Sequence, residues 1–103
     1  MKVRPFYTYY VAHIIRQYFF SDPPVNPTPA YRMNADAVKK VVGNLSKRDV
    51  TILKDIYRTD GENGPSVSVR VAVAAEHYGL DKSDVWELVS TTERRVAQAR
   101  QLI

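Results

Sequence analysis

The sequence predicts an all-α protein of about five helices in a single domain, residues 1–103. Apolar residues recur at helical spacing in five segments, and segments rich in proline or glycine divide them. A chain of 103 residues suffices for one domain with a modest core. Its hydrophobic share of 45% and charged share of 25% are those of an ordinary globular protein, which excludes disordered and fibrous classes.

The first helix is expected over residues 5–20. Its apolar side chains at helical spacing are Tyr7, Val11, Ile14, Ile15 and Tyr18. Phe6, Tyr10 and Phe19 widen this apolar face, so the helix is expected to be deeply buried or shared with a partner. Charged residues interrupt the run and no small-residue cleavage site follows, so we expect neither a signal peptide nor a membrane span here.

Residues 21–30 contain four prolines, which favour an extended linker over a helix. Asn34 is then expected to cap a second helix over residues 35–45, whose valines and leucine share one face. Residues 5–45 are therefore predicted to form an N-terminal pair of helices that a proline-rich linker connects.

A third helix is expected to begin at Ser46, because Asp49 follows three residues later as in a capping box. Residues 60–66 combine glycine, asparagine and proline and predict a loop, and their acidic residues lack the spacing of a calcium-binding loop. A fourth helix is expected over residues 68–78. The valines there also alternate as in a strand, but an isolated strand would have no partner.

Asp81 is expected to cap a fifth helix that continues to Ile103. Gly79 can supply the left-handed backbone that a turn between the fourth and fifth helices needs. Two helices joined by a short, glycine-containing turn are typical of the helix-turn-helix, whose second helix lies in the major groove of DNA. Residues 46–103 are therefore predicted to form a helix-turn-helix unit.

Two segments, LSKRDVTILKDIY and VRVAVAAEHYGLDKSDVWELVSTTERRVAQARQL, resemble region four of bacterial sigma factors. That region pairs an LS-x-R-D/E helix with a helix-turn-helix and a basic tail. The most specific residues of the resemblance are Leu45, Ser46, Arg48, Asp49, Leu53, Ala75, Gly79, Leu80 and Val85. The whole chain is also similar to small sigma-like proteins of prophages in Gram-positive bacteria, with an aromatic N-terminal helix and a proline-containing linker. These resemblances imply a DNA-binding transcription regulator of phage or prophage type.

The resemblance places the recognition-helix role on Lys82, Ser83, Trp86 and Glu87. Glutamate can accept a hydrogen bond from cytosine, and serine can bond either base of a pair. Sigma recognition helices usually present several cations, whereas Lys82 lies here beside acidic residues, so affinity must come from other residues. The candidates for phosphate contacts are Arg70, Lys82, Arg94, Arg95, Arg100, Lys47 and Arg48. Trp86 is expected to serve packing or a protein interface rather than base contact.

Residues for catalysis or metal binding are not apparent. The chain has no cysteine, which excludes disulfides and thiolate chemistry and favours a cytoplasmic location. Its two histidines, His13 and His77, lie far apart, so no metal site is expected. His77, Asp81 and Ser83 crowd around one turn and would not aim at one another as a hydrolytic triad. The sequence therefore predicts a non-enzyme without a cofactor.

The formal net charge of +4 and the pI near 9.5 favour double-stranded DNA as the partner, although the basic residues concentrate before residue 60. The alternative is a helical interaction module that contacts RNA polymerase, a phage component or another copy of itself through Trp86 and the tyrosine-rich first helix. The acidic character of the presumed recognition helix favours this alternative. The sequence shows no heptad seam, and oligomeric state stays open.

Overall fold

A computed structural model, which describes residues 5–58 and 67–103, contains five α-helices and, within these residues, no strand. The helices are α1 (Thr8–Phe20), α2 (Pro29–Val42), α3 (Lys47–Tyr57), α4 (Val67–Tyr78) and α5 (Lys82–Ala99). The all-α prediction is confirmed, and the alternating valines of α4 are helical. The loop predicted over residues 60–66 lies outside the described residues.

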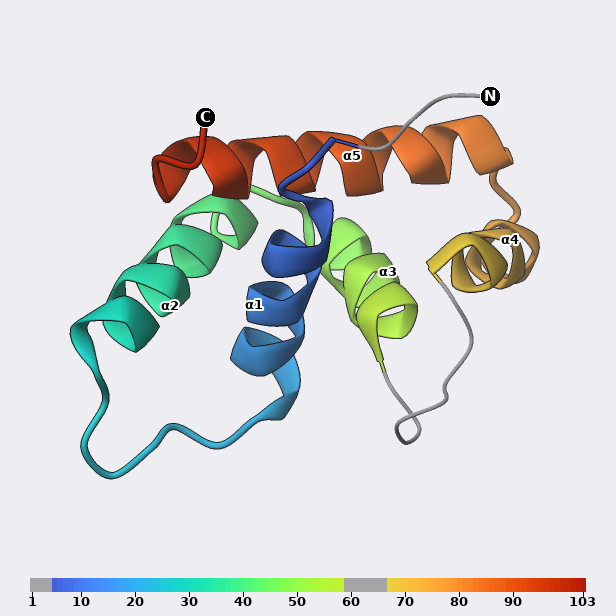
Figure 1. The fold of residues 1–103 in the computed structure, drawn as a ribbon. Helices are drawn as coiled ribbons and strands as arrows, with labels where there is room; N and C mark the ends of the chain where they lie inside the picture. The colour runs from blue at the N-terminus through green and yellow to red at the C-terminus, as the bar shows by residue number, and fades with distance from the viewer. Residues whose placement is uncertain (1–4, 59–66) are drawn as a thin grey trace.

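The longest helix, α5, runs along one side of the molecule (Figure 1). The helices α2, α1 and α3 lie side by side beneath it, with α1 in the middle, and α1 packs against all three of its neighbours α2, α3 and α5. Under the first turns of α5 lies α4, which also packs on α3. The helices α3, α4 and α5 therefore form a compact corner at one end of the molecule.

The core is aliphatic apart from Tyr57, and every helix contributes to it. Its largest fully buried side chains are Tyr57, Ile14, Ile15, Ile52, Leu53, Ile56, Val11, Val38, Val71, Val85, Val89 and Val96. Each such aliphatic side chain contributes about 1.5–3 kcal/mol relative to full exposure. The aromatic residues of the N-terminal segment are divided: Tyr7, Tyr18 and Phe19 are partly buried against this core, whereas Phe6 is 81% and Tyr9 86% exposed.

The helix α2 begins earlier than the sequence predicts. Thr28 caps it, because its Oγ1 accepts a hydrogen bond of 3.1 Å from the Tyr31 amide, and Pro29 takes the first helical position, where its missing N–H costs nothing. The prediction that Asn34 caps this helix is wrong, since Asn34 is buried in its middle. The helix also ends at Val42, three residues before the predicted end.

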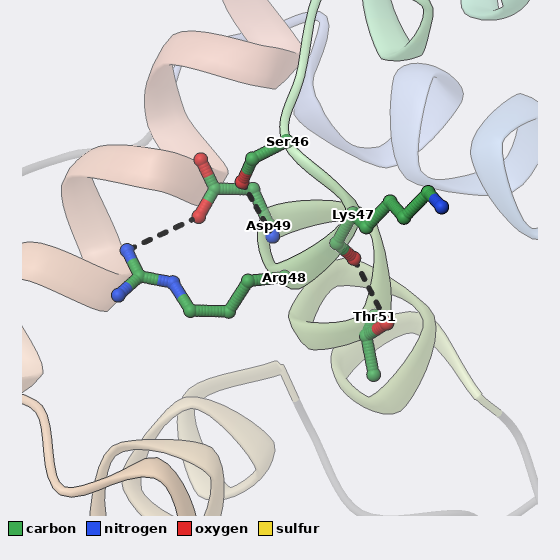
Figure 2. A network of polar contacts seen from close by, with 5 residues as sticks. All are labelled: Ser46, Lys47, Arg48, Asp49 and Thr51. Atoms are coloured by element: carbon green, nitrogen blue, oxygen red, sulfur yellow. Dashed lines mark hydrogen bonds and ion pairs between the residues drawn. The ribbon is translucent and has the colours of Figure 1, made fainter.

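The predicted N-cap of α3 is confirmed, because Ser46 Oγ accepts a hydrogen bond of 3.1 Å from the Asp49 amide (Figure 2). Asp81 occupies the N-cap position of α5, but its side chain accepts no capping hydrogen bond. The expectation that α5 continues to the last residue is wrong. Gln101 adopts a left-handed backbone with φ of 61°, and the Leu102 amide donates back to the Ala97 carbonyl at 2.8 Å, which ends the helix.

Candidate nucleic-acid interface

The turn between α4 and α5 has the backbone that its glycine predicts. Gly79 has a φ of +66°, and the Leu80 amide donates a hydrogen bond of 2.8 Å to the Ala75 carbonyl. This pattern is a Schellman motif, in which a residue with positive φ reverses the chain directly after a helix. Leu80 packs against the core, and Ala74 and Ala75 are buried where the two helices approach. Figure 1 shows α4 nearly end-on while α5 runs across the view, so the helices meet at a steep angle.

The exposed surface of α5 has two different sides. Ser83, Glu87 and Arg94 are all exposed and follow one another at spacings of four and seven residues, so they form one outward stripe. Lys82 and Trp86 are four residues apart and lie on another side of the helix. Lys82 is exposed, whereas Trp86 is half-buried and packs against the core. Three of the four predicted recognition residues are therefore exposed, and Trp86 is the one that is half-buried.

The beginning of α3 brings a cation to α5. Figure 2 shows Arg48 reaching toward α5 while Lys47 points the opposite way. Arg48 lines a shallow hollow of about 340 Å³ between the two helices, the α3–α5 hollow, with Asp49, Ile52, Leu80, Asp84, Val85, Glu87, Leu88 and Thr91. Two predicted site residues from different helices, Arg48 and Glu87, thus border the same depression.

The charge of Arg48 is partly balanced within its own helix. Its Nη2 lies 3.5 Å from Asp49 Oδ1, and the Arg48 side chain remains 67% exposed. An ion pair this exposed contributes about 0–1 kcal/mol, so Arg48 is free to exchange this partner for a phosphate at little cost. Lys47 is exposed as well, and its carbonyl accepts a hydrogen bond of 2.9 Å from Thr51 Oγ1.

Two of the predicted phosphate contacts form hydrogen bonds to other helices of the chain. The Arg70 Nη1 donates to the Asp55 carbonyl at 3.5 Å, which ties α4 to α3. The Arg100 Nε donates to Asn34 Oδ1 at 2.6 Å, which ties the end of α5 to α2. Both arginines are half-buried, and in the structure their guanidinium groups link helices rather than project into solvent.

Two further arginines among the predicted phosphate contacts, Arg94 and Arg95, are exposed on the second half of α5. Arg95 lies four residues after Thr91, so it extends the wall of the α3–α5 hollow by one turn. Arg94 belongs to the outward stripe. The exposed cations around this part of α5 are thus Arg48, Arg94 and Arg95, together with Lys82 at its first turn.

Carboxylates share the same surface. Asp81, Asp84 and Glu87 are exposed in the first two turns of α5, where Lys82 is the only cation. Asp84 lies in the first turn, where the positive end of the helix dipole favours a negative charge. The first half of α5 therefore carries more acidic than basic side chains, and the basic residues other than Lys82 lie around it.

Sequence reasoning missed the residues that form the floor of the α3–α5 hollow and the polar contacts beneath it. Leu88 and Thr91 are half-buried and line the hollow, and neither was among the predicted site residues. Glu93 is buried and accepts a hydrogen bond from Tyr57. Its spacing of four residues after Val89 and three before Val96 signals an inward position, but no sequence pattern identifies its partner.

Comparisons of the chain with protein-family models, with curated proteins and with solved structures found no match in any of the three. Within the described part of the chain, no group of three His, Asp or Glu side chains gathers closely enough to hold a metal ion. Over the same residues, every helix falls short of the length or the apolar character that crossing a membrane requires.

Proposed function

We propose that this protein is a DNA-binding transcription regulator in which α4, the turn at residues 79–81 and α5 act as a helix-turn-helix. The observation that carries the proposal is the α4–α5 corner, where a glycine at φ of +66° joins two steeply crossed helices and leaves the outward stripe of α5 uncovered. The resemblance of the α3–α5 segment to sigma region four supports the same function and a phage or prophage type of regulator.

Phosphate contacts are assigned to the cations that surround α5. Arg48 projects from the N-terminus of α3 toward α5, and Arg94 and Arg95 project from its second half. When α5 enters a major groove, side chains on both sides of it approach the phosphates of the two strands. Lys82 would reach the backbone near the start of the helix, whereas Arg70 and Arg100 keep their internal contacts.

Base contacts are assigned to the outward stripe. Glu87 is suited to accept a hydrogen bond from the amino group of a cytosine, and Ser83 is suited to either base of a pair. The carboxylates of α5 reduce non-specific attraction to phosphates, so binding would depend more strongly on correct base contacts than it does in a protein with a basic recognition helix.

The first experiment is fluorescence anisotropy with a labelled duplex from the upstream region of the protein's own gene and with a scrambled duplex, each at low and near-physiological salt. We expect tighter binding to the native duplex that persists at the higher salt. Equal binding to both duplexes that disappears with salt would reject sequence recognition, and the absence of binding to either would reject the proposal.

Two single-charge variants sharpen this experiment. Arg48→Ala should weaken binding and reduce the slope of log affinity against log salt by about 1, because one phosphate contact is lost. Arg32→Ala removes the same charge from an exposed position on α2 that is not among the assigned phosphate contacts, and should leave the slope unchanged. Equal losses in both variants would mean that overall charge, rather than the α5 surface, attracts DNA.

The second candidate function is a protein-interaction module without DNA readout. The observation that favours it is the exposed acidic group of Asp81, Asp84 and Glu87 on α5, which repels phosphates. Under this function RNA polymerase, a phage component or a second copy of the chain would bind the α5 surface. Failure of duplex binding together with loss of a complex upon Glu87→Lys would select this candidate.

A further inference from the structure

A second surface depression, remote from the outward stripe of α5, lies among α1, α2 and α3. It has a volume of about 470 Å³, and its lining consists of Tyr18, Phe19, Lys39, Val42, Gly43, Val50 and Lys54. We call it the Lys39–Lys54 groove. No residue of α4 or α5 lines it, so it is independent of the proposed DNA-binding surface.

The floor and walls of this groove are apolar. Tyr18 and Phe19 from the end of α1 are half-buried, and so are Val42 of α2 and Val50 of α3. The two aromatic rings contact each other edge to face, with centroids 5.6 Å apart. A partner that covers these four side chains would gain from removing apolar surface from water.

The rim of the groove is positively charged and contains no carboxylate among its lining residues. Lys39 stands exposed on the α2 wall and Lys54 on the α3 wall. Neither lysine forms an ion pair within the described part of the chain, and Lys54 Nζ instead lies 5.6 Å from the centroid of the Phe19 ring.

The acidic residues of α3 point to other neighbours. Asp49 lines the α3–α5 hollow, and Asp55 accepts a hydrogen bond from the Tyr78 hydroxyl of α4. The charge of the Lys39–Lys54 groove is thus left uncompensated by the helix that forms one of its walls. A ligand that presents carboxylates at its edges and an apolar group at its centre would complement both features of the groove.

We propose that the Lys39–Lys54 groove binds an acidic peptide segment of a partner protein, with one or two apolar side chains seated over Tyr18, Phe19, Val42 and Val50 and carboxylates paired with Lys39 and Lys54. A single nucleic-acid strand fits less well. Stacking needs free aromatic faces, whereas the rings of Tyr18 and Phe19 are half-buried against the core and against each other.

The probe for this site is a labelled synthetic peptide of about ten residues, mostly Asp and Glu, with Leu and Phe at i, i+4 spacing. Saturable binding by anisotropy, with amide shifts in nuclear magnetic resonance spectra confined to the groove residues, is the expected result. Two control peptides separate the contributions: one carries Gln and Asn in place of the acids, and the other carries Ser in place of Leu and Phe. Both should bind much more weakly.

Variants of the lysines locate the site. Lys39→Glu should weaken the peptide roughly tenfold, because it replaces an attraction with a repulsion at a partly desolvated position. Lys40→Glu changes the net charge equally at the adjacent exposed residue, which does not line the groove, and should have a far smaller effect. Lys54→Gln should also weaken binding, and duplex binding should be alike in all three variants.

Several results would overturn the proposal. One is the absence of saturable binding up to about 1 mM peptide. Another is equal weakening of peptide binding by Lys39→Glu and Lys40→Glu. A third is a set of peptide-induced amide shifts at residues outside the groove. If an oligothymidylate shifts the groove residues and the peptide does not, the groove is a nucleic-acid site. If sedimentation shows a dimer that Lys39→Glu dissociates, the occupant is a second copy of the chain.

Discussion

The hydroxyl of Tyr57 donates a hydrogen bond of 2.5 Å to Oε2 of Glu93 in the middle of the core. Tyr57 is fully buried and Glu93 is 3% exposed, so this bond joins α3 to α5 in a region shielded from water. Arg16 of α1 places its guanidinium carbon 5.9 Å from the centroid of the Tyr57 ring. Three helices therefore meet at one polar contact, which fixes how α3 is oriented against α5.

Tyr57→Phe should destabilise the fold by about 1–3 kcal/mol, because a buried carboxylate loses a hydrogen-bond donor while the ring that contacts Arg16 is retained. Urea denaturation followed by circular dichroism measures the loss. Tyr9→Phe, at a tyrosine that is 86% exposed, is the matched control and should stay within about 0.5 kcal/mol of the unmodified chain. A Tyr57→Phe protein as stable as this control would show that the bond contributes nothing.

The two left-handed residues that end α4 and α5 predict opposite effects of substitution. Gly79→Ala should cost about 1–2 kcal/mol, and the cost is one of backbone conformation, since an added Cβ would meet no atom within 4 Å. Gln101→Gly removes similar strain at φ of 61° but adds about 0.5–1 kcal/mol of glycine entropy. A net gain of about 0.5 kcal/mol is therefore expected. Denaturation midpoints that move in the same direction for both variants would contradict this explanation.

Local rules of sequence predicted some of these features well. Ser46 and Gly79 were identifiable because a cap and a helix-ending glycine depend on residues only a few positions away. The start of α2 was not predicted because the sequence offers two acceptable N-caps. One is Thr28, which Pro29 follows, and the other is Asn34, and no local rule chooses between them. Tertiary contacts favour the cap at Thr28, because they use the side chain of Asn34 elsewhere: Asn34 Nδ2 donates to the Tyr10 hydroxyl at 3.2 Å, and Asn34 Oδ1 accepts from Arg100.

In the candidate site, too, features that depend on nearby residues were predictable and features that depend on tertiary packing were not. Ser83, Glu87 and Arg94 were named from the sequence as candidates for DNA contact, and all three are exposed on α5. That Arg48 and Glu87 line the same hollow was not predictable, because it depends on how α3 packs against α5. The internal hydrogen bond of Arg100 was also not predictable, since its partner lies 66 residues away in the chain.

Tyr78 provides a prediction about alkaline pH. The hydrogen bond that its hydroxyl donates to Asp55 raises the pKa of Tyr78, and burial and the negative charge of Asp55 act in the same direction. The folded chain therefore holds this proton more tightly than the unfolded chain, in which the pKa is about 10. The resulting stabilisation is complete below pH of about 10 and is lost as the pH rises through the higher folded-state pKa.

The measurement is tyrosinate absorbance against pH, taken as the difference between the unmodified chain and Tyr78→Phe. The midpoint of this difference titration should move downward in Asp55→Asn, which removes the charge beside the hydroxyl. Asp36→Asn changes an exposed carboxylate of α2 and should leave the midpoint in place. An unchanged midpoint in Asp55→Asn would mean that the Asp55 carboxylate does not control this proton.

Glu87 distinguishes base readout from simple repulsion at the α5 surface. If its carboxylate accepts a hydrogen bond from a cytosine, Glu87→Gln should weaken binding to the preferred duplex by about 1–3 kcal/mol and relax the preference at one base pair. If the carboxylate only repels phosphates, the same change should strengthen binding to every duplex by a similar factor, because one negative charge near the backbone is gone. Anisotropy titrations against duplexes that differ at single positions separate these outcomes.

Glu76→Gln is the matched control, since it removes an exposed carboxylate from α4, off the outward stripe. A stronger, non-selective affinity in Glu87→Gln alone would therefore reject Glu87 as a base-reading residue while leaving α5 as the DNA-binding helix.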